Sequence, residues 1–359
     1  MKIISIIGTR PQFIKYAILA KQLRRIHKDV LINTGQHYDY NMNKIFFDQL
    51  NIPNPDYNLM IGSGTQAYQT GEMMKGIEDI LIKEKPDMVM VYGDTNSTIA
   101  GALAAVKLHV HIAHVESGLR SFDRSMPEEI NRILTDHCSD YLFCPTQKAI
   151  DNLKREGMTE GVYLTGDVMV DALNFNKEKA ERSDILNRLE LTSKKYLLVT
   201  VHRASNTEVR ENLNNIAESL YRLGNAGETI VFPIHPRTLK VLKTIKLYDE
   251  LRMKVRMIEP LGYFEFLKLL NHARKVLTDS GGIQKEAYIL KVPCITLRQN
   301  TEWTETIKDG WNILAGTDKE KIIELAQTFM PAHSYSSIFG EGACEKIAKL
   351  LGSKSNNKK

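Results

Sequence analysis

Short runs of β-branched and other apolar residues alternate along the chain with longer stretches in which apolar residues recur at helical spacing. In the first half, the short runs lie at 3–7, 30–33, 88–92, 111–115 and 141–143. A second series follows a polar stretch, at 196–201, 229–234, 255–258, 275–278 and 293–297. Runs of this length that alternate with helices are typical of βαβ units and a parallel sheet.

Two such series in tandem predict an α/β chain of two Rossmann-like, doubly wound domains facing a cleft. The length of 359 residues also favours two domains, which we place at 1–167 and 168–340. Ligands of doubly wound sheets bind outside the carboxyl ends of the strands, and polar residues and glycines gather there in this sequence. We therefore expect the site in the cleft between the domains.

Composition narrows the class of protein. Hydrophobic residues make up 43% and charged residues 25%, which is typical of a globular chain, and no apolar run approaches the length of a membrane span. The net charge of +5 is too modest to indicate nucleic acid, although it leaves room for a local phosphate site. The cysteines Cys138, Cys144, Cys294 and Cys344 lack zinc-binding spacing, so we expect no metal and a reducing, cytoplasmic compartment.

Arg10 and Lys15 lie in a segment that follows the first predicted strand and opens a helix. The N-terminus of such a helix can receive an anion, with both side chains as cations. The segment is no Walker loop and lacks GxGxxG, so no nicotinamide cofactor is expected. An ordinary strand-to-helix turn with a surface arginine explains it equally well.

Three carboxylates could form an acid/base site. Asp94 and Glu116 end neighbouring strands, and Glu128 lies four residues before Arg132 near a helix start. Asp94 could instead cap a helix, whereas glutamate is a poor cap. The Glu128 and Arg132 pair could be only a surface salt bridge.

His202 and His235 each follow a strand in the second half, where a histidine can bind phosphate or move protons. A single histidine is more often structural.

The turn at Ser280, Gly281 and Gly282 carries the strongest local signal. A strand runs into it at a helix start, where free backbone N–H groups can hold a diphosphate, and Glu286 can accept from ribose hydroxyls. A tight turn and a cap would explain the glycines but not a buried approach of both.

Six motifs together resemble one known family. They are GTRPQFIK, GDTNST, HVESGLRS, MPEEINR, HRASNT and DSGGIQKEA. Their order is similar to that in the non-hydrolysing UDP-N-acetylglucosamine 2-epimerases, and the resemblance covers about residues 1–350. It implies a GT-B-like fold in which a C-terminal helix, 341–355, joins the N-terminal domain. We expect a UDP-sugar substrate, no cofactor, no nucleic acid or membrane partner, and a homodimer.

The resemblance also implies roles for single residues. The expected catalytic residues are Asp94, Glu116, Glu128 and His202. The expected UDP-sugar ligands are Arg10, Lys15, Arg132, His235, Ser280, Gly281, Gly282 and Glu286. The implied chemistry is removal of the C2 proton with anti elimination of UDP, followed by return of UDP and a proton with the opposite C2 configuration. The product would supply surface polysaccharide or glycan synthesis.

Several positions depart from the family pattern. Trp303 replaces an arginine, and Lys285 stands where a glutamate is common. The segments GTRPQFIK, HRASNT and TEWTE resemble more closely the branch acting on UDP-2,3-diacetamido-2,3-dideoxyglucuronate. Lys285 could favour an anionic sugar, but a surface lysine on a helix is the commoner case. Gln36-His37 keeps part of an effector site, whereas Asp39 and Gly64 replace its donors, so we expect no effector response.

Three other functions stay open at this point. The first is plain interconversion of UDP-N-acetylglucosamine and UDP-N-acetylmannosamine. The second is a GT-B glycosyltransferase, which the fold alone does not distinguish from an epimerase. The third is a nucleotide-sugar-binding protein without catalysis. The cluster of acids favours elimination and re-addition, because that reaction needs several proton-handling groups.

Overall fold

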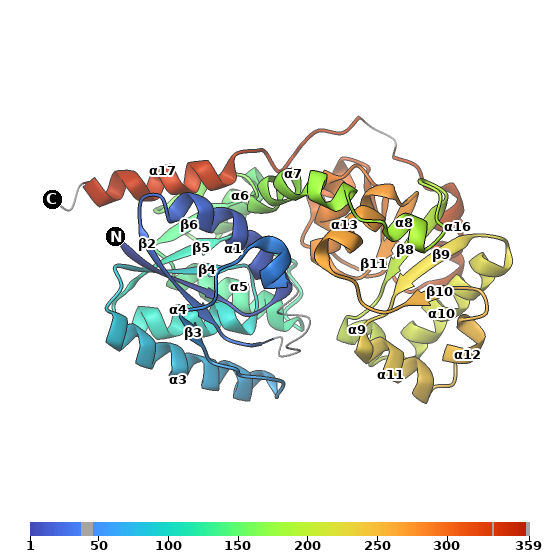
Figure 1. Ribbon diagram of the computed structural model, residues 1–359, viewed down its shortest axis with the longest axis horizontal. Helices are drawn as coiled ribbons and strands as arrows, with labels where there is room; N and C mark the ends of the chain where they lie inside the picture. The colour runs from blue at the N-terminus through green and yellow to red at the C-terminus, as the bar shows by residue number, and fades with distance from the viewer. Residues whose placement is uncertain (37–45, 332–333, 357–359) are drawn as a thin grey trace. The chain divides into compact units, whose positions relative to one another are not determined.

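The computed structural model describes residues 1–36, 46–331 and 334–356, the last three without their side chains. The chain forms two compact units (Figure 1). The N-terminal unit comprises Met1–Phe175 and Phe339–Lys359, and the C-terminal unit comprises Asn176–Ile338. Each unit contains one parallel sheet flanked by helices.

The N-terminal unit is built on a seven-stranded sheet with the order β3-β2-β1-β4-β5-β6-β7. Its strands are β1 (Lys2–Ile7), β2 (Lys28–Asn33), β3 (Tyr57–Asn58), β4 (Met88–Tyr92), β5 (His111–Val115), β6 (Tyr141–Cys144) and β7 (Val162–Leu164). Its helices are α1 (Arg10–Leu23), α3 (Gln66–Glu84), α4 (Asn96–Lys107), α5 (Pro127–Cys138), α6 (Gln147–Arg155), the start of α7 (Val168–Glu181) and α17 (Ala343–Asn356). The strand order reverses between β1 and β4, and ligands of such sheets bind at this switch point.

The C-terminal unit repeats the design with a six-stranded sheet of order β10-β9-β8-β11-β12-β13, whose switch point lies between β8 and β11. Its strands are β8 (Tyr196–Thr200), β9 (Thr229–Pro233), β10 (Arg256–Ile258), β11 (Lys275–Thr278), β12 (Cys294–Thr296) and β13 (Asn312–Leu314). Its helices are α8 (Ile185–Arg188), α9 (Ala204–Thr207), α10 (Arg210–Asn225), α11 (Pro236–Thr244), α12 (Tyr248–Leu251), α13 (Tyr263–His272), α14 (Gly281–Ile289), α15 (Thr304–Lys308) and α16 (Lys319–Thr328).

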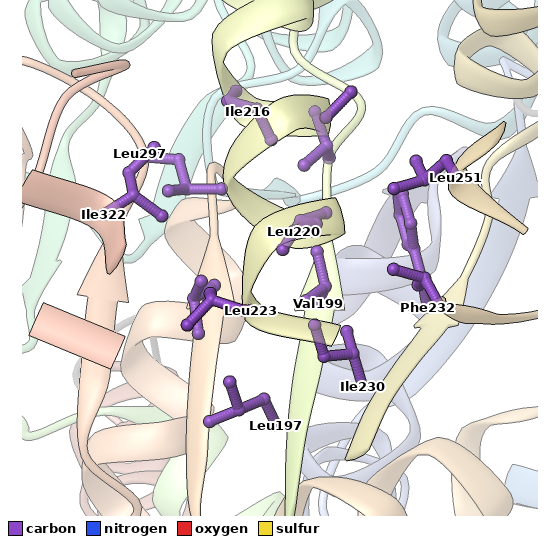
Figure 2. Close-up of a cluster of buried hydrophobic side chains, with 14 of the residues drawn as sticks. Leu197, Val199, Ile216, Leu220, Leu223, Ile230, Phe232, Leu251, Leu297 and Ile322 are labelled. Carbon is purple, nitrogen blue, oxygen red and sulfur yellow. The ribbon is translucent and has the colours of Figure 1, made fainter. Parts of the chain in front are cut away.

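Strand β8 is buried on both of its faces. Leu197 and Val199 pack in one core cluster with Leu220 of α10 (Figure 2). Leu198 points to the opposite face, where it packs in a second cluster with Leu269 of α13. Burial on both faces explains why this strand reads as a continuous apolar run instead of an alternating one.

All ten predicted strands are present, with ends that agree or differ by at most two residues. Three short strands, β3, β7 and β13, were not predicted. Each is an edge strand of two or three mostly part-exposed residues, which leaves little apolar run to detect. The fourth edge strand, β10, is equally short but was predicted from the run at 255–258.

The two units separate within α7, after the predicted boundary at 167/168. The start of α7 stays with the N-terminal unit because Val168 and Leu173 are buried there, while Asp171 accepts from the backbone N–H groups of Gly342 and Cys344. These contacts hold the start of α17, which packs against α1. Among the described residues, none of the helices combines the length and hydropathy needed to cross a membrane.

Candidate functional site

The Gln12 side chain joins the turns that follow β1 and β4. It is buried, and its Oε1 accepts from the N–H groups of Gly8 (2.8 Å) and Thr9 (3.1 Å). Its Nε2 donates to the Tyr92 carbonyl (2.9 Å) and to Thr95 Oγ1 (2.9 Å). The start of α1 is therefore held in a defined position beside the β4–α4 turn.

Lys15, in the second turn of α1, forms an ion pair with Glu116, which directly follows β5, and their side chains are only 5% and 10% exposed. Glu116 has a φ of +74°, a left-handed conformation that costs free energy in a residue with a side chain. It persists because the N–H groups of Glu116 and Ser117 both donate to the Phe143 carbonyl at 3.1 Å. The carboxylate is thus presented at a fixed place by a strained backbone.

Arg132 of α5 links Asp94 to a second buried acid. Its Nη2 pairs with the Asp94 carboxylate, and its Nη1 lies 3.0 Å from Oε2 of Glu129. Glu129 also accepts from the N–H groups of Ser121 and Phe122, both at 2.9 Å. Asp94 is about one-third exposed, whereas Glu129 is buried, so Asp94 is the acid that a ligand can reach.

The predicted acid Glu128 is half-buried in the first turn of α5. Helical spacing alone does not distinguish Glu128 from Glu129 as the partner of Arg132, because a helix puts both i+3 and i+4 on one face, and Glu129 was not predicted. The Arg10 guanidinium lies 5.0 Å from the centre of the Phe46 ring.

Asp279 organises the corresponding turn of the C-terminal unit. It is fully buried, and its carboxylate accepts from the N–H groups of His202 (3.0 Å) and Arg203 (2.9 Å) and from Asn206 Nδ2 (3.1 Å). His202 Nδ1 lies 3.6 Å from the same carboxylate. Asp279 was not among the predicted site residues, although it directly precedes Ser280 in the strongest motif.

His235 lies beside His202, with 5.7 Å between the ring centres. His235 caps α11, since its Nδ1 accepts from the Arg237 N–H at 3.1 Å. A ring nitrogen that accepts carries no hydrogen, so the neutral ring donates from Nε2. Two predicted phosphate ligands are therefore neighbours.

The two glycines at the start of α14 serve different purposes. Gly281 is buried, and a Cβ there would lie 2.0 Å from Oε1 of Glu302, which pairs with Arg298 at 3.1 Å. Gly282 is exposed, and its Cβ would approach only Ser280 Oγ, at 3.9 Å. The expected buried approach holds for Gly281 alone; Gly282 leaves the N-terminus of the helix open.

Lys285 and Glu286 are both buried. The interpretation of Lys285 as a surface lysine is therefore wrong. Its Nζ lies 4.5 Å from the centre of the Trp303 ring, a distance typical of a cation–π contact. The two departures from the family pattern, Lys285 and Trp303, thus contact each other.

Part of the predicted effector site lies outside the described residues, namely His37 and Asp39. Oε1 of Gln36 accepts from the backbone N–H (3.0 Å) and the hydroxyl (2.7 Å) of Ser97 at the start of α4. In the part of the chain that the structure describes, no three histidine, cysteine or acidic side chains gather as metal ligands would.

Comparison with known proteins places this geometry in a family. The sequence profile of the UDP-N-acetylglucosamine 2-epimerases matches residues 21–352. The chain belongs to the UDP-N-acetylglucosamine 2-epimerase family. A UDP-N-acetylglucosamine 2-epimerase homologue of Methanococcus maripaludis is 56% identical over 98% of this chain and 99% of its own.

Two further members of the family are similar over nearly their whole length. The UDP-2,3-diacetamido-2,3-dideoxy-D-glucuronate 2-epimerase of Pseudomonas aeruginosa is 46% identical, covering 98% of this chain and 99% of its own. The crystal structure of the Methanocaldococcus jannaschii UDP-GlcNAc 2-epimerase with UDP-GlcNAc and UDP matches with a TM-score of 0.93 and 49% identity. That match covers 98% of this chain and 100% of the other. The predictions of the family and of a GT-B-like pair of Rossmann-like domains are confirmed.

Alanine substitutions at Gly281 and Gly282 test the different surroundings assigned to these two glycines. Gly281→Ala should destabilise the fold by about 1–3 kcal/mol, because the new methyl group must displace the buried Glu302 carboxylate from Arg298. Gly282→Ala should change the free energy of unfolding by less than about 1 kcal/mol. Urea unfolding of both variants without ligand measures the difference, and equal stabilities would contradict the assignment.

Proposed function

We propose that the chain inverts C2 of a UDP-linked 2-acetamido sugar without hydrolysing it, by elimination and return of UDP. The observation that carries the proposal is the placement of Asp94 and Glu116 at the ends of neighbouring strands, each paired with a buried cation. Similarity to the enzyme of M. jannaschii, whose crystal structure contains UDP-GlcNAc and UDP, supports the same activity.

The carboxylates and cations of the N-terminal unit act on the sugar. Removal of the C2 proton requires a base, and the departing diphosphate requires cations or an acid. Asp94, Glu116 and Glu128 supply the carboxylates. Lys15 and Arg132 orient two of them and provide positive charge that a bound diphosphate can share.

The residues around the start of α14 in the C-terminal unit bind UDP. The diphosphate lies over the open N-terminus at Gly282, with His202 and His235 as donors, while Glu286 accepts from the ribose. Arg10 of α1 is a further cation of the N-terminal unit. The glycal and UDP must both stay bound after the C1–O bond breaks, so that UDP can return to C1.

Two UDP-sugars are candidate substrates. The relatives reported above include enzymes named for UDP-N-acetylglucosamine and one named for the diacetamido-glucuronate analogue. The buried Lys285 already contacts Trp303, so its charge is no direct sign of an anionic sugar. We propose UDP-N-acetylglucosamine as the first substrate to test. No observation favours a glycosyltransferase.

We further propose that the enzyme acts in the cytoplasm as a homodimer and supplies a mannosamine-type sugar for polysaccharide synthesis. Its four cysteines are free thiols, which suits a reducing compartment. Burial raises the pKa of the Cys294 thiol to about 12, so that thiol stays protonated and unreactive.

Turnover in heavy water tests the chemistry. Because C2–H is broken and remade, the product should carry solvent deuterium at C2, measured by NMR with no acceptor present. Glu116→Gln should lower kcat by about 10²–10⁴, the usual contribution of a general acid or base. Glu72→Gln, an exposed amide replacement on α3, serves as the matched control and should keep full activity. Product without deuterium at C2 would rule out elimination.

Measurements of UDP affinity test the proposed UDP site of the C-terminal unit separately from the chemistry. Gly282→Ala places a methyl group where the diphosphate approaches, so Kd for UDP should rise about tenfold or more, or about 1.4 kcal/mol. Glu286→Ala should raise it by about 10- to 100-fold through loss of charged hydrogen bonds. Glu320→Ala, on a 68% exposed side chain of α16, is the control. Calorimetry showing unchanged UDP affinity in both test variants would remove UDP from this turn.

The kinetics should be hyperbolic in substrate. Gly64 offers no side chain to an effector, an aspartate at 39 repels anions, and the acceptor of Gln36 is occupied by Ser97. Initial rates measured over a wide range of UDP-sugar concentration check this. A sigmoidal curve that Gln36→Ala or His37→Ala converts to a hyperbola would show that an effector site operates.

A further inference from the structure

His114 belongs to the motif that ends in Glu116, yet it has no role in the chemistry described above. It lies on β5, and its ring is fully buried. Nδ1 is 2.7 Å from Oδ1 of Asp136, and Nε2 is 2.7 Å from the carbonyl oxygen of Gly93. Both partners are acceptors, and a neutral ring has only one N–H. Two such contacts therefore require the doubly protonated, positively charged ring.

Asp136 of α5 is ionised in this arrangement. Its Oδ2 also accepts from the Gly118 N–H (3.1 Å) and from Arg120 Nη1 (2.6 Å). Burial by itself would raise the pKa of Asp136, but the hydrogen bonds and charges of His114 and Arg120 outweigh it and lower that pKa. A carboxylate with these donors cannot supply the hydrogen that a neutral histidine would need from it.

The charges around His114 balance. Arg120, from the segment after β5, also forms a two-pronged pair with Glu156, the C-cap residue of α6, at 2.7 and 2.8 Å. Glu156, Arg120, Asp136 and His114 thus alternate in sign along one chain of contacts. On the side of β6, burial raises the pKa of the Cys144 thiol to about 12, so it adds no charge. A buried cation is tolerable where it is paired in this way.

The contact of His114 with Gly93 lies directly beside the proposed catalytic acids. The Gly93 N–H donates to the Val115 carbonyl at 2.9 Å, so β5 holds both sides of this glycine. Asp94 follows Gly93, and Glu116 follows Val115. A Cβ on Gly93 would lie 3.2 Å from Glu116 Oε2, so the glycine peptide and the carboxylate are close neighbours.

We propose that His114 is a charged positioning residue, whose imidazolium holds the Gly93 carbonyl and so sets Asp94 and Glu116 relative to each other. This inference rests on the proposed epimerase function for its kinetic consequence. The charge of the ring is independent of that function.

Two substitutions separate the two contacts of the ring. His114→Gln can place its amide N–H near the position of Nε2 and keep the donation to Gly93. His114→Asn can place its amide near Nδ1, which keeps Asp136 but loses Gly93. We expect kcat of the Asn variant to fall about 10²-fold with KM changed little, the size of effect that a misplaced catalytic group produces. The Gln variant should stay within about fivefold of the unmodified enzyme. Equal kcat values for the two variants would overturn the positioning role.

NMR of the full chain labelled with ¹⁵N-histidine tests the charge without substrate. The His114 signal is the one missing from either variant, and slow exchange of its buried N–H protons identifies it even if neither variant folds. Both ring nitrogens should carry a proton in the folded chain at neutral pH, because each lies 2.7 Å from an acceptor. A ring nitrogen without a proton under these conditions would overturn the charged assignment. An enzyme without epimerase activity but with this doubly protonated ring would refute the proposed function and leave the charge assignment intact.

Discussion

The N-terminal site depends on one buried amide, that of Gln12. Its oxygen holds the turn after β1 and its nitrogen holds the turn after β4, so a single side chain sets the distance between the two strand ends at the switch point. Only a group with both donors and acceptors can bond an N–H on one side and a carbonyl on the other. Lys15 and Asp94 are carried by the two elements that this amide joins.

The C-terminal unit meets the same requirement with a different side chain. Asp279 follows β11 and bonds the backbone after β8, across the switch point of the second sheet. Here every partner is a donor, so a carboxylate suffices where the first unit needs an amide. In both units a buried polar residue joins the two turns from which the proposed ligand-binding side chains project, and its satisfied hydrogen bonds offset the cost of burying it.

The sequence predicted features that many residues specify together, and it was less informative about features that depend on a single side-chain contact. Strands buried on both faces, such as β8, were predicted from their apolar runs, whereas β13 at a sheet edge left no such trace. The order of the motifs identified the family. In contrast, helical spacing could not choose between Glu128 and Glu129, and a lysine at 285 gave no sign that its ammonium packs on Trp303. Those choices depend on side-chain packing between segments distant in sequence.

The buried charges and the strained backbone of the N-terminal unit cost free energy, and this cost is evidence about what the arrangement is for. Buried ion pairs rarely stabilise a fold more than apolar residues of the same volume would. Here the Lys15 and Glu116 pair is buried and the backbone of Glu116 is held in a left-handed conformation. Strain and buried charge at one strand end persist only where the surroundings over-determine them, as the two N–H contacts to Phe143 do here. A fold selected for stability alone would have no need of this arrangement, whereas a site that must hold carboxylates ready for proton transfer does.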